Sequence, residues 1–284
     1  MAEINPVLLK ELRQRFRRGK TAGLLSLYLL VLGGFVLAII YLNWRNSPGF
    51  YQPGRSRDIF MTLSFAQLGL LAFVAPALTS SVISGERERQ TLNVLLTTRL
   101  TTRGIIWSKL VASIAFVVIL IFATLPLYSI VFLYGGIAPG QVLGAFGFYL
   151  LTMFFFACLG LTCSTFFKRT GISTLTSYGL VMALTGGTGF LAAFINEAAR
   201  INRPESIVNP GFWAWVVQLL QDINPVFVLM EILGEDGIKT GVFLGLSSWG
   251  VYTVFCLGVG LLLLYWSSRL LLPRKNQHRS MRTQ

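Results

Sequence analysis

Charged side chains are scarce in this 284-residue sequence. Asp, Glu, Lys and Arg together make up 12% of the residues, about half the share that a soluble domain usually carries. Hydrophobic residues make up 54%. So little charge excludes an ordinary soluble globular protein.

Histidine and cysteine, which serve most often in metal sites and nucleophilic catalysis, are also rare. The one histidine, His278, lies in a polar tail, and Cys158, Cys163 and Cys256 lie inside apolar runs. This pattern indicates neither a disulfide framework nor a zinc site, and it leaves no Ser–His pair for a hydrolase within a membrane. We therefore expect no catalytic residue, no metal and no bound cofactor in this chain.

Motifs that would let the chain power itself are absent too. The sequence contains no Gly-x-x-x-x-Gly-Lys-Ser/Thr, the loop that holds nucleotide phosphates in many ATPases. Its long uncharged stretches offer no Asp, Glu, Lys, Arg or His, and ion-coupled carriers use such residues within their spans. A conduit powered by another protein fits the sequence better than an ATPase or an ion-coupled carrier.

Five stretches of 24 to 58 residues carry no charge. A helix needs about 20 apolar residues to cross the hydrocarbon core of a bilayer, so the longest stretch is long enough to cross twice. Gly and Pro at 135–140 predict a turn in the middle of that stretch. The apolar runs are continuous rather than alternating, which predicts helices and not strands. We predict an all-α integral membrane protein in which residues 21–267 hold six transmembrane helices, at about 21–43, 59–83, 105–134, 141–167, 172–196 and 241–267.

The segment 204–238, before the last span, is less apolar and carries five acidic residues. Pro210 and Pro225 each follow an asparagine, an order typical of a helix that starts with an Asn cap and a Pro at its first position. We therefore predict two short interfacial or re-entrant helices on the outer side, at about 211–221 and 225–234. A seventh span is the alternative.

Lysine and arginine are unevenly divided between the loops. If both termini are cytoplasmic, the inner segments hold 18 Lys and Arg residues and the outer segments hold 6. Cytoplasmic loops of membrane proteins are enriched in these residues. The formal net charge of +13 is therefore interpreted as a property of one membrane face and not as a nucleic-acid-binding surface. We predict a multi-pass protein of the plasma (inner) membrane with cytoplasmic N- and C-termini and a basic cytoplasmic tail at 268–284.

The first 20 residues form a separate element. A helix that starts at Asn5 and Pro6 would carry apolar residues at every fourth position and basic residues on its other faces. The apolar residues include Leu8, Leu12 and Phe16, and the basic residues include Arg13 and Arg17. Such a helix lies along a membrane surface, where its basic side meets anionic lipid. We predict a cytoplasmic amphipathic helix over 1–20.

The inner loop between the second and third spans, residues 84–109, has a pattern of its own. Ser84 is placed to cap a helix, and Glu86 falls in the first turn, where the helix dipole favours a carboxylate. Three leucines then follow a helical i, i+3, i+4 spacing: Leu92, Leu95 and Leu96. We predict a helix at about 84–98. On these residues alone, an amphipathic helix resting on lipid headgroups is an equal alternative.

This loop and the N-terminal segment resemble a known family. The pattern Glu86-x-Glu88-x-x-Thr91-Leu92-x-x-Leu95-Leu96-Thr97-Thr98 is similar to the signature that follows the second span of ABC-2 type transporter permeases. The residues from Asn5 to Arg13 resemble the connecting helix at the start of many of these permeases. Gln90 stands where the signature frequently has glycine.

The resemblance implies a permease subunit that binds no ATP itself. Residues 86–98 would be a coupling helix that docks on a separate ABC ATP-binding subunit. Its apolar contacts would be Leu92, Leu95 and Leu96, its polar rim would be Glu86, Arg87, Glu88 and Arg89, and Thr91 and Thr97 would lie beside them. The helix over 1–20 would support the movement at the membrane surface.

The family further implies a pair of permease subunits, identical or different, and export rather than import. A non-transporting membrane scaffold or assembly factor is the alternative function. The substrate is open, because the uncharged interiors of the spans carry no charged group that would select one.

The predicted topology can be tested with fusions. A reporter that is active only outside the cytoplasm should be silent when it is fused at Asn93 and active when it is fused at Glu205, because these positions lie on opposite faces of the predicted topology. Reporter activity in intact cells measures the difference. The reverse pattern would overturn the orientation.

Overall fold

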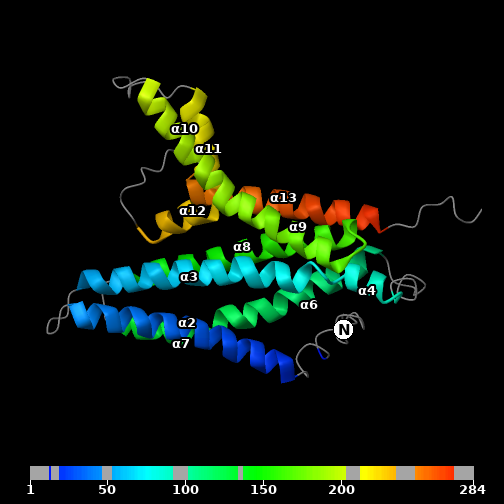
Figure 1. The fold of residues 1–284 in the computed structure, drawn as a ribbon, viewed down its shortest axis with the longest axis horizontal. Coiled ribbons are helices and arrows are strands. Elements are labelled where there is room, and N and C mark those ends of the chain that lie inside the picture. The colour runs from blue at the N-terminus through cyan, green and yellow to red at the C-terminus, as the bar shows by residue number, and fades with distance from the viewer. Residues whose placement is uncertain are drawn as a thin grey trace, which may run out of the picture.

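The computed structural model describes residues 13, 19–46, 53–91, 102–133, 137–202, 212–234 and 247–271. Within these ranges the chain is helical and contains no strand (Figure 1), which confirms the predicted all-α class. The elements are α2 (Gly19–Asn46), α3 (Pro53–Thr79), α4 (Ser84–Glu88), α6 (Thr102–Ala123), α7 (Leu125–Leu133), α8 (Pro139–Phe166), α9 (Thr170–Met182), the π-helical turn η1 (Ala183–Gly187), α10 (Thr188–Asn202), α11 (Phe212–Ile223), α12 (Pro225–Ile232) and α13 (Ser248–Leu270).

In the described part of the chain, six helical segments are long and apolar enough to cross a membrane, one at each predicted span, and α11 with α12 would make a seventh if that bent pair is one span. In chain order they are Ala22–Leu42, Arg57–Glu88, Gly104–Phe132, Pro139–Phe166, Thr170–Ala198 and Ser248–Leu270, and we call them the first to the sixth span. The second contains α3 and α4, the third contains α6 and α7, and the fifth runs from α9 through η1 into α10. Each exceeds the roughly 20 residues that a crossing needs, so the chain is a multi-pass membrane protein.

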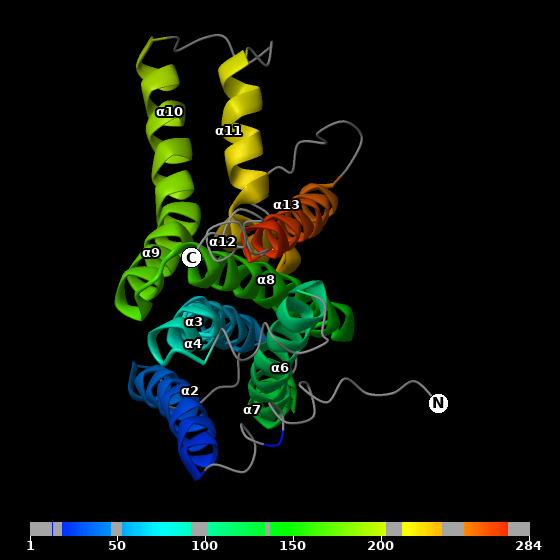
Figure 2. The same ribbon diagram turned by 90° about the vertical axis from the view of Figure 1, so that its right-hand side faces the viewer.

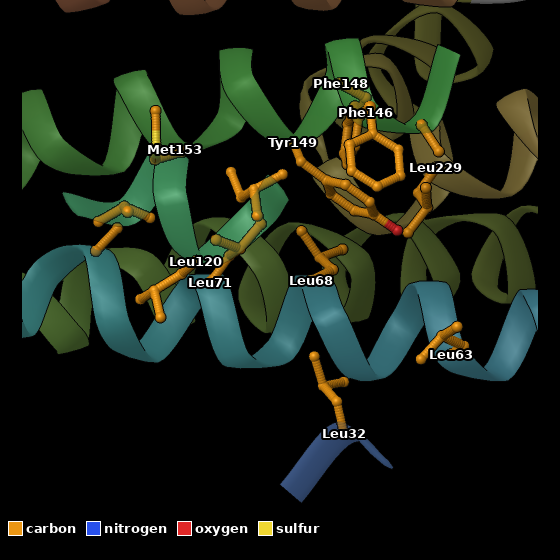
Figure 3. Close-up of a cluster of buried hydrophobic side chains, with 14 of the residues drawn as sticks. Leu32, Leu63, Leu68, Leu71, Leu120, Phe146, Phe148, Tyr149, Met153 and Leu229 are labelled. Atoms are coloured by element: carbon orange, nitrogen blue, oxygen red, sulfur yellow. The ribbon is translucent and has the colours of Figure 1, made fainter. Parts of the chain in front are cut away.

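The fourth span, α8, forms the centre of the bundle and contacts α3, α6, α9, α12 and α13. In its most apolar stretch 61% of the residues are buried, against 17% in the first span and 11% in the fifth. Figure 3 shows Phe146, Phe148 and Tyr149 of α8 close to Leu229 of α12. Lipid is as apolar as these side chains, so close packing rather than transfer from water holds the helices together.

The third span breaks between α6 and α7 for a reason that is visible in the sequence. Pro126 lies just after the break and has no amide hydrogen to continue the helical ladder. The Thr124 hydroxyl lies 2.7 Å from the Ile121 carbonyl oxygen and 3.2 Å from Oε1 of Gln67 on α3. The Thr124 hydroxyl therefore connects the break in the third span to α3 of the second span.

Two helices, α10 and α11, pack against each other and project together from the rest of the bundle (Figure 2). The chain then bends by 79° between α11 and α12. The bend lies at Asn224, whose side chain caps α12, and Pro225 is the first residue of that helix. The earlier Asn–Pro pair, at 209–210, lies outside the described residues.

Two predicted elements fall largely outside the described ranges. Of the predicted N-terminal amphipathic helix, Arg13 is described, and it is helical and exposed. At the other end of the chain, the last span ends at Leu270, three residues into the predicted tail. The other predicted interfacial residues, Leu8, Leu12, Phe16 and Arg17, are not among the described residues. The helix over 1–20 and the tail at 268–284 therefore stay predictions.

The close approach of α3 and α8 predicts a stability effect. A β-carbon at Gly160 of α8 would overlap the hydroxyl of Thr79 and crowd the amide of Ser80. Gly160→Ala should therefore lower the free energy of unfolding by about 1–3 kcal/mol through overpacking. Gly147→Ala on the same helix is the matched control, since no atom lies within 4 Å of its added β-carbon.

Thermal unfolding of the purified chain in detergent compares the two variants. The melting temperature of Gly160→Ala should fall, and that of Gly147→Ala should stay the same or rise. Equal melting temperatures would show that α3 and α8 do not approach this closely.

Candidate functional site

The turn between α3 and α4 is hydrogen-bonded to α8. Ser164, near the end of α8, accepts hydrogen bonds from the amides of Ile83 at 2.8 Å and Ser84 at 2.9 Å. Amides at a helix start lack partners within their own helix, and here a neighbouring helix supplies the acceptor. Ser84 itself does not cap α4, contrary to its predicted role: Ile83 holds the cap position, and the Ser84 hydroxyl donates to the Ser80 carbonyl at 3.1 Å.

A buried ion pair joins α4 to α6. Nζ of Lys109 lies 2.6 Å from Oε1 of Glu86, with 3% of the lysine side chain and 26% of the glutamate side chain exposed. A lysine buried to this extent needs a partner to remain charged. Glu86 supplies the opposite charge and so holds α4 against the start of the third span.

The next two residues of α4 bind the corner between α8 and α9. Arg87 donates to the carbonyls of Thr165 at 3.2 Å and Phe167 at 3.4 Å, where α8 ends. Glu88 accepts from the Thr170 amide at 2.7 Å and from the Thr170 hydroxyl at 3.0 Å, where α9 begins. Helix dipoles favour a cation at a C-terminus and an anion at an N-terminus. The two side chains therefore match the two helix ends in sign.

Ser80, the residue just after α3, is hydrogen-bonded directly to α9. The Ser173 hydroxyl donates to the Ser80 carbonyl at 2.6 Å, and the Ser80 hydroxyl lies 2.9 Å from the hydroxyl of Thr174. Together with the contacts of Ile83–Glu88 described above, these bonds form one connected set, which we call the α4 junction. It joins the second, third, fourth and fifth spans.

The helix α4 is shorter than the predicted coupling helix and ends at Glu88. The Gln90 amide bonds the Arg87 carbonyl at 3.2 Å, and the Thr91 amide bonds the Glu86 carbonyl at 3.0 Å, which is the hydrogen-bond pattern of a Schellman helix end. Gln90 has a φ of 58°, a left-handed conformation that costs a residue with a β-carbon roughly 1–2 kcal/mol. This conformation explains why glycine is frequent at this position of the signature.

The predicted coupling residues divide into three groups. Glu86, Arg87 and Glu88, predicted as a rim that faces a partner, bind α6, α8 and α9 within the chain. Arg89 and Thr91 are exposed. Leu92, Leu95, Leu96 and Thr97 lie outside the described residues, and contact with a partner stays a prediction.

Sequence reasoning missed the residues to which α4 is bonded. Ser164, Thr165 and Thr170 lie near the ends of predicted spans, where small hydroxyl residues are common in membrane helices and carry no distinctive signal. Lys109, in contrast, was recognisable in the sequence, because it is a single charge near the start of the predicted third span. A charge at such a place calls for a partner, and Glu86 lies at the other end of the same loop.

Comparison with known proteins agrees with the resemblance. The sequence model of a family described as ABC-2 family transporter protein matches residues 6–233. That range contains the first five spans, the α4 junction and both helices beside the 79° bend. A search of curated proteins found no match to the chain.

The ion pair of the α4 junction predicts a non-additive effect on stability. Glu86→Gln or Lys109→Met alone should lower the free energy of unfolding by roughly 3 kcal/mol, because each removes the opposite charge beside a partly or fully buried charged group. The double variant should recover part of that loss. Arg89→Gln, on the exposed residue just after α4, is the control and should have little effect.

Thermal unfolding of the four variants in detergent gives the comparison. A double variant that is destabilised by the full sum of the two single changes would show that Glu86 and Lys109 do not act as a pair.

Proposed function

The chain belongs to the ABC-2 family of transporter proteins, and on that basis we propose that it is the permease subunit of an ATP-driven exporter. The permease would form the path across the membrane, and a separate ABC subunit would bind and hydrolyse the ATP. The sequence supports this division because it has no P-loop motif. The long uncharged stretches within its spans also fit a path that is not driven by ion coupling.

The α4 junction is the observation that carries the proposal. Its hydrogen bonds and its ion pair connect α4, which belongs to the second span, to the third, fourth and fifth spans. A displacement of the segment after α4 would reach all four spans together, because shear and hinge movements pass between helices through such packed contacts. A short helix attached in this way is suited to receive movement from a partner.

We assign two roles to the predicted coupling residues. Glu86, Arg87 and Glu88 would fix α4 to its own subunit, so that movement is transmitted and not lost in a flexible loop. The exposed Arg89 and Thr91 and the residues that follow would contact the ATP-binding subunit. Those following residues are Leu92, Leu95, Leu96 and Thr97.

The proposed orientation places both termini in the cytoplasm of the plasma (inner) membrane. The division of Lys and Arg between the loops supports it, and it puts the α4 junction on the side where ATP is available. A second permease subunit, identical or different, would complete the path. The first and fifth spans bury 17% and 11% of their apolar stretches within the subunit, which leaves surface for lipid and for that second subunit.

The docking role of the leucines predicts a loss of association. Leu95→Arg should abolish co-purification with the ABC ATP-binding subunit, because a charge would enter an apolar contact and remain unpaired. Leu95→Met is the control and should retain association, since it conserves volume and apolarity. Membrane insertion of both variants should equal that of the parent chain.

Affinity co-purification after co-expression measures this outcome. Unchanged association of Leu95→Arg would remove the docking role from the segment. A parent chain that binds no ABC ATP-binding subunit would favour the scaffold function instead.

A further inference from the structure

The fifth span contains a π-helical turn, η1, near its middle. At this turn the Thr188 amide bonds the Ala183 carbonyl, five residues back, and skips the carbonyl of Leu184. The Thr188 hydroxyl donates to that carbonyl at 2.6 Å. Turns of this kind are rare and occur frequently at functional positions.

Asn224 connects this turn to the bend between α11 and α12. Its side-chain Nδ2 donates to the Thr185 carbonyl at 2.7 Å and lies 2.9 Å from the Thr188 hydroxyl, which accepts. Its Oδ1 accepts from the Val226 amide at 2.8 Å and so caps α12. Only 1% of Asn224 is exposed. Because both amide hydrogens and the amide oxygen are bonded, the side chain fixes the π turn and the start of α12 relative to each other.

The other end of α12 is attached to different helices. The carbonyl of Leu233 accepts from Nε2 of Gln141 on α8 at 3.2 Å, and the carbonyl of Gly234 accepts from the guanidinium of Arg57 on α3. Gly234 has a φ of 77°, the left-handed conformation in which glycine commonly ends a helix. The short helix α12 therefore bridges the fifth span to α3 and α8.

The two ends of this connection lie far apart along the bundle. Figure 1 shows α4 toward one end and α12 toward the other. The fifth span covers the distance between them: Glu88 of α4 is bonded to its first residue, and Asn224 is bonded to its π turn. Only 11% of its apolar stretch is buried, against 61% in α8, so less packing holds it within the subunit.

We propose that Asn224 is a positioning residue that joins the fifth span to the α11–α12 pair, so that a displacement of the fifth span moves α11 and α12 with it. The joint itself is a property of this subunit alone. The displacement at α4 rests on the proposed function, in which an ATP-binding subunit supplies it. Movement would then pass from α4 through Glu88, α9 and the π turn to Asn224.

Hydrogen exchange of the full chain in lipid nanodiscs tests the joint. Asn224→Asp keeps the acceptor for the Val226 amide but removes both donors, and Thr188→Val removes the hydroxyl that bonds both Leu184 and Asn224. Thr176→Val is the matched control, because the Thr176 hydroxyl bonds the Ile172 carbonyl of its own helix and is exposed.

Exchange of the amides at 183–189 and 226–229 should rise about tenfold in Asn224→Asp and in Thr188→Val. It should stay within about twofold of the parent in Thr176→Val. Exchange at the π turn that is unchanged in both Asn224→Asp and Thr188→Val would overturn the joint, and so would an equal rise in the Thr176 control.

Spin-label distances in the complex with the ATP-binding subunit test the movement. Leu143, Leu175 and Phe212 are exposed on α8, α9 and α11, and the native cysteines are buried. Cysteine substitutions at 143 and 175 report the fifth span, and substitutions at 143 and 212 report α11. ATP should change both distances in the parent, and Asn224→Asp should abolish the change at α11 while retaining the change at α9.

The outcomes separate the joint from the proposed function. A change at α11 that persists in Asn224→Asp would overturn the joint. A parent chain that binds the ATP-binding subunit but shows no change at α9 would contradict transmission through Glu88. In that case the exchange rates still decide whether Asn224 joins the two elements.

Discussion

A helix leaves amides unpaired at its start and carbonyls unpaired at its end, and within a membrane the protein must supply their partners. The structure of this chain depends on how that requirement is met. Ser164 accepts from the first amides of α4, Glu88 accepts from the first amide of α9, and Arg87 donates to the last carbonyls of α8. At the other end of the bundle, Arg57 and Gln141 donate to the carbonyls that end α12. In each case the partner comes from a different helix.

A cap supplied by another helix does more than remove an unpaired group. When a helix caps itself, the bond moves with the helix, but a cap from a neighbour fixes two elements relative to each other. The α4 junction is of this kind. Asn224 caps its own helix, α12, but its amide nitrogen also bonds the π turn of the fifth span, so it too fixes two elements relative to each other. Meanwhile α8 is buried on most sides and provides the fixed frame. The same bonds that satisfy the backbone therefore define which helices are connected, and in the proposed mechanism these helices move together.

Parts of this arrangement were predictable from particular residues. The uncharged stretches gave all six spans, and the order Asn224-Pro225 gave the start of α12. The extent of α4 was not predictable, because the spacing of the leucines favours a continuous helix and no glycine marks the left-handed residue at Gln90. The direction of Glu86, Arg87 and Glu88 was also missed. A run of alternating charges beside a membrane is usually solvated. Here these side chains instead bond Lys109 and the nearby helix ends, which the sequence does not place beside them.

By itself, the sequence determined the class of the protein, the approximate positions of six long apolar helices and its resemblance to ABC-2 permeases. These follow from composition and order along the chain, because the thickness of a bilayer sets a length that a single segment either meets or does not. The tertiary structure alone decided which helix end each polar side chain satisfies. That choice depends on which helices are neighbours in space. The partners are far apart in the chain and meet only when the spans have packed, as Glu88 meets Thr170 and Asn224 meets Thr185.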